Sequence, residues 1–249
     1  MRHKTRSLIA AALILLLPVA DSANAAVQEA RIERVALASG ATARVIKGQT
    51  KGYTYVDYLL HAGAGQTLSV EMKSSNAANY FNINPPGSEI SMFIGSTSGA
   101  RFSGVLPVEG DYTIRVYLMR NAARRKELAN YTLTLGLAGQ PLMATPAAKD
   151  ALIPGTPFHA SATIACAPPF AAKETTCEAF VIRRGFDGTA TVEIRWGDGL
   201  KRRILFVKGQ ASASDAPDTV SVVRQGDVNV VSLGNSERFD IPDALIFGG

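Results

Sequence analysis

Four cationic side chains stand close together in the segment YLMRNAARRKELANYTL, residues 117–133. They are Arg120, Arg124, Arg125 and Lys126. A guanidinium forms charge-assisted and often bidentate hydrogen bonds with a carboxylate, so these side chains could bind an acidic partner. If NAARRKE makes one helical turn, Arg120 and Arg124 are four residues apart and project from the same face. The alternative interpretation is a solvated loop tip whose charges serve solubility.

The flanking segments predict how this stretch is held. DYTIRVYLM and YTLTLGL both alternate apolar with polar residues, the period-two pattern of half-buried strands. Hairpins usually close over two to five residues, whereas this connection takes about a dozen. We therefore expect a long loop at residues 119–130 that reaches beyond the strands toward a partner.

The residue types needed for hydrolysis do not form a recognisable pattern. A nucleophilic triad needs a base and an orienting acid, but His61 follows a predicted strand beside a glycine turn and His159 opens a later segment. The motif G-x-S-x-G is absent, and GSTSGARFSG is better interpreted as a turn. Carboxylates for glycoside cleavage could come from anywhere in the chain, and no pair stands out. We therefore predict that the protein is not an enzyme and has no catalytic residues.

Metal and cofactor motifs are also missing from the sequence. Asp187, Asp198 and Asp227 lie in isolated glycine turns without the alternating order of a calcium loop. Phosphate-binding glycine loops are absent. The sequence predicts no metal site and no cofactor.

The first 25 residues have the features of a secretory signal. MRHKTR is a basic start, SLIAAALILLLPVA is an apolar stretch too short for a membrane span, and ANA offers a cleavage site before Ala26. We expect an exported, periplasmic protein that does not span the membrane. Nucleic acid is not an expected partner in that compartment.

Cys166 and Cys177 are the two cysteines of the chain. An exported protein meets oxidising conditions, which favours a disulfide closing a short loop. Neither His61 nor His159 lies at a metal-ligand spacing from the cysteines, so a structural disulfide is the preferred interpretation.

Short strand patterns separated by Gly, Pro, Asn and Ser predict an all-β protein. We expect an antiparallel β-sandwich over residues 26–140, as in ARVIKGQ, YTYVDYLLHA and QTLSVEMKS. Residues 141–158 hold four prolines and predict a linker. Residues 159–249 predict a smaller β-rich domain, with turns at the GDG of 197–199 and at Gly226-Asp227.

Charge divides unevenly between these parts. Residues 26–140 hold 12 Lys/Arg and 8 Asp/Glu, a balance of 12 − 8 = +4, and residues 141–249 hold 11 and 12, a balance of 11 − 12 = −1. Much of the excess is in the loop, which favours one specific acidic contact over general attraction to polyanions. For the second part we expect a solvated, charge-balanced surface that includes Arg183, Arg184, Arg195, Lys201, Arg202 and Arg203.

Residues 40–138 resemble a known family. GYTYVDYLLHAGAGQTLSVEM, NYFNINPPGSE and above all GDYTIRVYLMRNAARR…ANYTLTL are similar to the periplasmic inhibitors of g-type lysozyme, and beneath that to the pre-peptidase C-terminal β-sandwich fold. In that family, loops of the sandwich enter the lysozyme's substrate cleft. The resemblance implies a g-type lysozyme or related muramidase as partner. It implies the following lysozyme-binding residues: Arg120, Arg124, Tyr53, Asn121 and Arg125.

The C-terminal part departs from the simple inhibitors and resembles an uncharacterised exported domain. An alternative function is therefore a non-catalytic periplasmic binding or adaptor protein for glycan or an envelope protein. In that case the second domain would carry the binding function and the first would be a spacer. A hydrolase is a third hypothesis, which requires turnover of a substrate.

Overall fold

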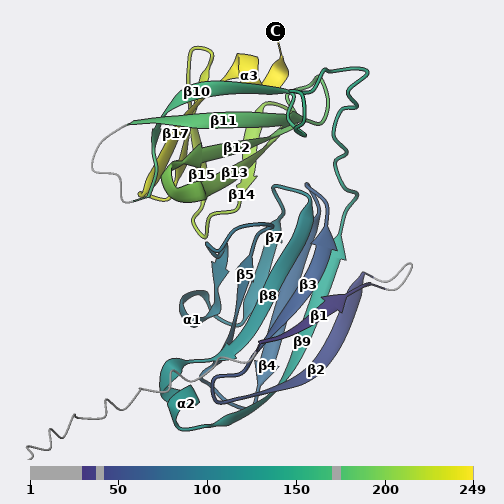
Figure 1. The fold of residues 1–249 in the computed structure, drawn as a ribbon, viewed down its shortest axis with the longest axis vertical. Coiled ribbons are helices and arrows are strands. Elements are labelled where there is room, and N and C mark those ends of the chain that lie inside the picture. The colour runs from purple at the N-terminus through teal and green to yellow at the C-terminus, as the bar shows by residue number, and fades with distance from the viewer. Residues whose placement is uncertain (1–29, 38–41, 170–174, 249) are drawn as a thin grey trace, which may run out of the picture.

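The structure is a computed structural model that describes residues 30–37, 42–169 and 175–248. Figure 1 shows two β-structured bodies stacked end to end. The predicted signal at residues 1–25 lies outside the described residues. In the part that the structure describes, no helix is long and apolar enough to cross a membrane.

Two sheets packed face to face form the first body. One sheet has the order β1 (Ala30–Val35), β3 (Tyr55–Ala62), β8 (Gly110–Leu118), β5 (Asn79–Asn84) and β6 (Phe93–Ile94). The other has the order β2 (Ala43–Lys51), β9 (Leu128–Ala138), β4 (Thr67–Ser74) and β7 (Arg101–Val105). Two short helices lie in its connections, α1 (Gly95–Ser98) and α2 (Arg120–Arg124). The predicted strands of this region are present.

Alternate residues of each strand point into the space between the sheets. In β3 these are Val56, Tyr58 and Leu60, all buried. The Tyr58 and Tyr131 hydroxyls, one from each sheet, lie 2.8 Å apart in the core. One of these buried hydroxyls donates to the other, so both oxygen atoms take part in a hydrogen bond that joins the two sheets.

β1 is an element that the sequence analysis did not predict. It pairs in parallel with β3, from Ala30 opposite Tyr55 to Val35 opposite Leu60. Of its six residues only Val35 is buried, and Ile32 is 64% exposed. A strand with one buried apolar residue lacks the alternation by which strands are recognised, and its parallel partner lies far along the chain.

The second body is one curled sheet. Its order is β14 (Gln210–Ser214), β13 (Leu200–Val207), β12 (Ala190–Trp196), β11 (Thr175–Arg183), β10 (Ala160–Ala167), β17 (Glu237–Pro242), β16 (Val228–Leu233) and β15 (Val220–Gln225). A 3₁₀ turn, η1 (Gly197–Gly199), joins β12 to β13, and α3 (Asp243–Phe247) ends the chain. The all-β prediction is confirmed. Both predicted turns connect antiparallel strands, at η1 and at Gly226-Asp227.

The core of the second body lies inside the curl. Val192, Ile194 and Phe206 are fully buried there, together with Ile246 of α3. The apolar end of the chain thus packs inside the fold, because exposed Leu and Ile side chains would cost free energy in water.

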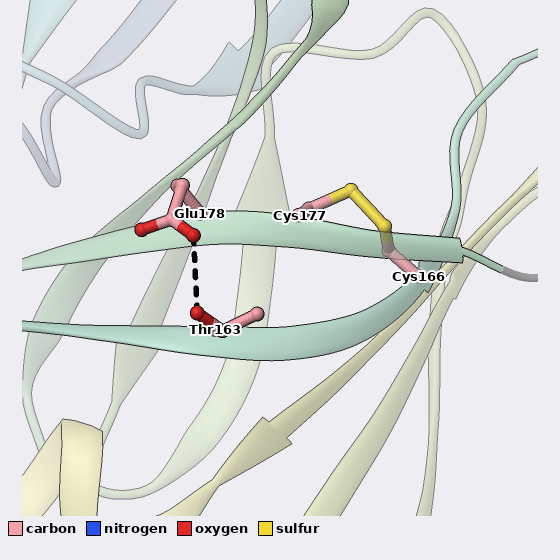
Figure 2. The surroundings of a disulfide bond; sticks show 4 residues. All are labelled: Thr163, Cys166, Cys177 and Glu178. Atoms are coloured by element: carbon pink, nitrogen blue, oxygen red, sulfur yellow. Dashed lines mark hydrogen bonds between the residues drawn. A yellow bond between two sulfur atoms is a disulfide. The ribbon is translucent and has the colours of Figure 1, made fainter.

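The predicted disulfide is confirmed. Cys166 of β10 and Cys177 of β11 are bridged, with their Cα atoms 5.9 Å apart and both side chains buried (Figure 2). Next to the bridge, the Thr163 hydroxyl donates a hydrogen bond of 3.0 Å to Glu178. The bridge therefore ties two neighbouring strands near the loop that connects them.

Residues 140–158 contain neither helix nor strand, as their prolines predict, but they are tied to both bodies. Leu142 donates its backbone N–H to Ala64 O at 2.8 Å, and its own carbonyl accepts from Arg184. Further on, Asp150 pairs with Arg183 at 3.0 Å. This segment is therefore held to both bodies by hydrogen bonds. The division into domains at 141–158 stays a prediction.

The expectation of a solvated surface for the second body's arginines is wrong for three of them. Arg183, Arg202 and Arg203 are 7%, 2% and 4% exposed. Arg202 shares the inner face of β13 with Phe206 and makes bonds of 2.8 and 2.5 Å to Glu237.

Arg203 points to the opposite side of β13, as the alternation of side chains along a strand requires, but that side is not exposed to solvent. It donates to Glu193 at 2.9 Å and to Asp215 at 3.2 Å. Thr191, which shares this outer side of β12 with Glu193, donates its hydroxyl to Pro107 O of the first body at 2.7 Å. The outer side is covered by the end of the sandwich, and local sequence could not reveal that contact.

Candidate functional site

The β8–β9 connection forms a short helical turn, α2, that packs against the end of the sandwich. Met119 N–H donates to Ala78 O at 2.9 Å, and Ala123 N–H donates to Met119 O at 2.9 Å. Ala122 and Ala123 are 0% and 1% exposed and pack with Leu118 in a small apolar cluster. Their small side chains let the turn lie against the body. The residues in excess of a short hairpin loop form this packed turn; they do not form an extended loop tip.

Arg120 and Arg124 lie on the side of α2 that faces solvent. Both are exposed, one at each end of the five-residue helix, at the spacing that the sequence predicted. Among the described arginines of the first body, these two alone have side chains without a hydrogen bond or ion pair. Their donors are therefore free for a partner.

Arg125 differs from its neighbours. Its Nε donates to Glu127 Oε1 at 2.6 Å, so the charge is already neutralised within the chain. Asn121 is exposed and its Oδ1 accepts the N–H of Ala122 at 2.8 Å. The partner-binding roles of Arg125 and Asn121 stay predictions.

Tyr53 lies at the same end of the sandwich as α2. It is 36% exposed, in the turn between β2 and β3. The preceding residue, Gly52, has φ +57° and donates its N–H to Glu127 O at 3.0 Å. The structure thus brings the Tyr53 turn beside the turn that carries Arg120 and Arg124. Figure 1 shows this end to be the one farthest from the second body.

The electrostatic character of this end is cationic. A shallow hollow of about 500 Å³ on the outer face of β2, β9 and β4 is lined by Lys47 and Lys73 with serine, threonine and asparagine side chains. Glu127, which follows α2, accepts hydrogen bonds from Asn76 and Arg125, which hold its pKa below the usual value. It therefore stays ionised and bound within the chain.

Asn76 and Glu127 are site residues that the sequence analysis did not identify. Asn76 Nδ2 donates to Glu127 Oε2 at 2.8 Å, which joins the β4–β5 connection to the segment after α2. The SSNAAN stretch around Asn76 is typical of a turn, but nothing in it indicates a partner 51 residues away.

The two histidines in the described residues, His61 and His159, are each bonded to neighbouring groups of the fold. His61 is exposed, with Nδ1 3.1 Å from Asp111. His159 is buried, its Nδ1 accepts the N–H of Arg183 at 3.0 Å, and Nε2 lies 2.9 Å from Thr145 O. Neither imidazole has a serine or cysteine nucleophile among these partners. In the residues that the structure describes, no group of three or more His, Cys, Asp or Glu could hold a metal ion.

Comparison with known proteins finds similar proteins over about half of the chain. No protein-family model matches the chain. The inhibitor of g-type lysozyme from Escherichia coli (strain K12) is 28% identical over 129 residues, which is 50% of this chain and 92% of that protein.

Solved structures give similar matches. The periplasmic inhibitor of g-type lysozyme from Aeromonas hydrophila is 33% identical and covers 44% of this chain and 98% of its own, with a TM-score of 0.41. The corresponding protein from Salmonella Typhimurium is 23% identical, covers 43% and 98%, and has a TM-score of 0.34. Over about half of its length, the chain is similar to the inhibitor of g-type lysozyme from Escherichia coli.

Proposed function

We propose that this protein inhibits a g-type lysozyme by placing the α2 end of its sandwich in the enzyme's substrate cleft. The observation that carries the proposal is the pair Arg120 and Arg124, both exposed and without a partner, on a turn whose opposite side is buried. The relatives named as inhibitors of g-type lysozyme support the partner.

The chemistry of such an inhibitor is binding. Glycoside-cleaving enzymes use carboxyl groups in a cleft, one of which protonates the leaving oxygen. A guanidinium delivered to that carboxyl forms a charge-assisted bond in a partly desolvated site and stabilises the ionised form, which cannot act as an acid. Tyr53 adds an aromatic contact at the rim. This mechanism needs no turnover, in agreement with the relatives, which are inhibitors.

The same comparison supports a periplasmic location. The related structures are of periplasmic proteins, and residues 1–25 have the composition of an export signal. We propose that the chain is exported and acts in the periplasm, where it protects cell-wall glycan from an incoming muramidase.

Inhibition is tested with purified mature protein, residues 26–249, titrated against g-type lysozymes on cell-wall substrate. We expect loss of muramidase turnover at near-stoichiometric ratios. Protein that is folded by circular dichroism and yet inhibits no g-type lysozyme refutes the proposal. Binding to cell-wall glycan or an envelope protein, without inhibition, would identify an adaptor instead.

A further inference from the structure

We propose that Glu127, together with Asn76, is a positioning residue that holds the α2 turn in its binding conformation. The consequence for inhibition rests on the proposed function, whereas the consequence for the turn itself does not. Glu127 itself does not contact the lysozyme; it acts through the backbone that carries Arg120 and Arg124.

Glu127 is the point where three connections of the sandwich meet. Its Oε2 accepts from Asn76 Nδ2 at 2.8 Å, and its Oε1 accepts from Arg125 Nε at 2.6 Å. Its backbone carbonyl accepts the N–H of Gly52 at 3.0 Å. One residue therefore links the β4–β5 connection, the end of the α2 turn and the turn that contains Tyr53.

Asn76 completes the link on the other side of α2. Its Oδ1 accepts the N–H of Ala78 at 2.9 Å, and Ala78 O in turn accepts the N–H of Met119, which precedes the helix. Its Nδ2 also reaches Leu128 O at 3.4 Å. Asn76 is thus bonded, directly or through Ala78, to both ends of the connection.

The turn needs such external ties. α2 has five residues, too few for a helix that is stable by itself. Lys126, which follows it, has φ +54°, a left-handed conformation that L-residues other than Asn and Asp rarely adopt. The bonds of Glu127 on the next residue hold the chain in that conformation. Without them we expect the segment to sample other conformations.

The same cluster decides which arginines are free. Glu127 binds Arg125 within the chain and leaves Arg120 and Arg124 as the unpaired pair. A partner then meets two guanidinium groups on an ordered backbone, and binding does not have to order that segment. Arg125 would accordingly brace the turn instead of entering the partner's cleft.

The experiment compares four single variants of the full mature chain and the double variant with Ala at both residue 76 and residue 127. Glu127→Ala removes both side-chain bonds, whereas Glu127→Gln retains an oxygen that can accept from Asn76. Asn76→Ala cuts the link from the opposite side. Glu71→Ala is the matched control, because it breaks an exposed pair with Arg101 at 3.0 Å on the same sandwich, in the β4–β7 register.

Two readouts are measured for each variant. Hydrogen exchange reports the amides of Ala123 and Lys126, which bond Met119 O and Ala123 O. The inhibition constant reports binding. We expect faster exchange and inhibition weakened about fivefold in Glu127→Ala and Asn76→Ala, the size of the cost of ordering a loop side chain or two. Glu127→Gln should recover most of both. The double Ala variant should weaken inhibition by less than the product of the two single effects, because both changes remove the shared Asn76–Glu127 bond.

Each outcome decides the proposal. If exchange at Ala123 and Lys126 in Glu127→Ala and Asn76→Ala equals that of the wild type, or if Glu71→Ala has the same effect, the proposal is wrong. If inhibition stays normal while Arg120→Ala abolishes it, the positioning role is also refuted although the inhibitor function stands. If the wild type inhibits no lysozyme, the proposed function fails, and the exchange measurement still decides whether Glu127 orders the turn.

Discussion

The two ends of this molecule use arginine in opposite ways. At the α2 end of the sandwich, Arg120 and Arg124 are exposed and have no partner within the chain. In the second body, Arg202 and Arg203 are nearly fully buried and each contacts two acids. An arginine without an acid near it is available to a partner, and a buried pair serves the fold.

The difference shows why charge counts alone mislead. The second part has more charged residues in total, 11 + 12 = 23 against 12 + 8 = 20. Yet each arginine there in the described residues has a partner within the chain. The first part has a modest excess, and its free charge collects at one end. Pairing, rather than the number of cations, distinguishes a binding surface from a structural network.

The largest expected effect is on the buried pair. Arg202→Ala leaves Glu237 buried without its partner, so we expect the free energy of unfolding to fall by about 3–5 kcal/mol. Chemical denaturation of the full chain measures it. The double variant Arg202→Met, Glu237→Leu should recover most of the loss, because it leaves no unpaired charge. A single variant as stable as the wild type would show that the pair is not essential to the fold.

The disulfide should have the next largest effect. Replacing both Cys166 and Cys177 by Ala removes the constraint on the unfolded chain, and the second body should lose about 2–3 kcal/mol of stability. Denaturation followed through Trp196 fluorescence reports this body, since Trp196 is the one tryptophan of the chain. Inhibition should persist wherever the double variant remains folded. Two free thiols in the exported wild-type protein, found by mass spectrometry, would contradict the bridge.

Substitution of the unpaired arginines should affect binding strongly and stability little. Arg120→Ala and Arg124→Ala should each weaken binding to the lysozyme by about 2 kcal/mol or more, as expected for buried hot spots of an interface. The unfolding free energy should change by less than about 0.5 kcal/mol, because both side chains are exposed and unpaired. Titration calorimetry and thermal denaturation measure the two quantities. Normal binding would exclude α2 as the inhibitory element, and unfolding would make its arginines structural.

The smallest expected effect is an acid-dependent loss of stability at the junction. Burial alone would raise the pKa of Glu193, but the bond from Arg195 and the charge of Arg203 outweigh it and leave the pKa below 4.5. A pKa lowered by folding gives stabilisation that is complete above about pH 4.5 and is lost as the pH falls through the folded value. The denaturation midpoint of the wild type should therefore decrease as the pH is lowered from 5 to 3. Glu193→Gln should show a shallower fall over the same range, and an equal slope would rule out this carboxylate as a cause.

Much of the fold could be predicted from local pattern. Alternation in DYTIRVYLM and YTLTLGL corresponds to β8 and β9, and the glycine turns correspond to hairpins. β1 could not be predicted, since its partner β3 lies elsewhere in the chain and it buries a single apolar side chain. The burial of Arg203 could not be predicted either, because the surface that covers it belongs to the other body.

For the candidate site, the sequence alone indicated the residue types, their spacing of four and the bridge between the two cysteines. Those follow from the helical repeat, from charge and from the chemistry of an exported chain. Only the tertiary structure decided that Arg120 and Arg124 are unpaired while Arg125 is not, and that the Tyr53 turn lies beside them. The reason is physical: whether a charge is free depends on Asn76, Gly52 and Glu127, which approach one another only when the two sheets close.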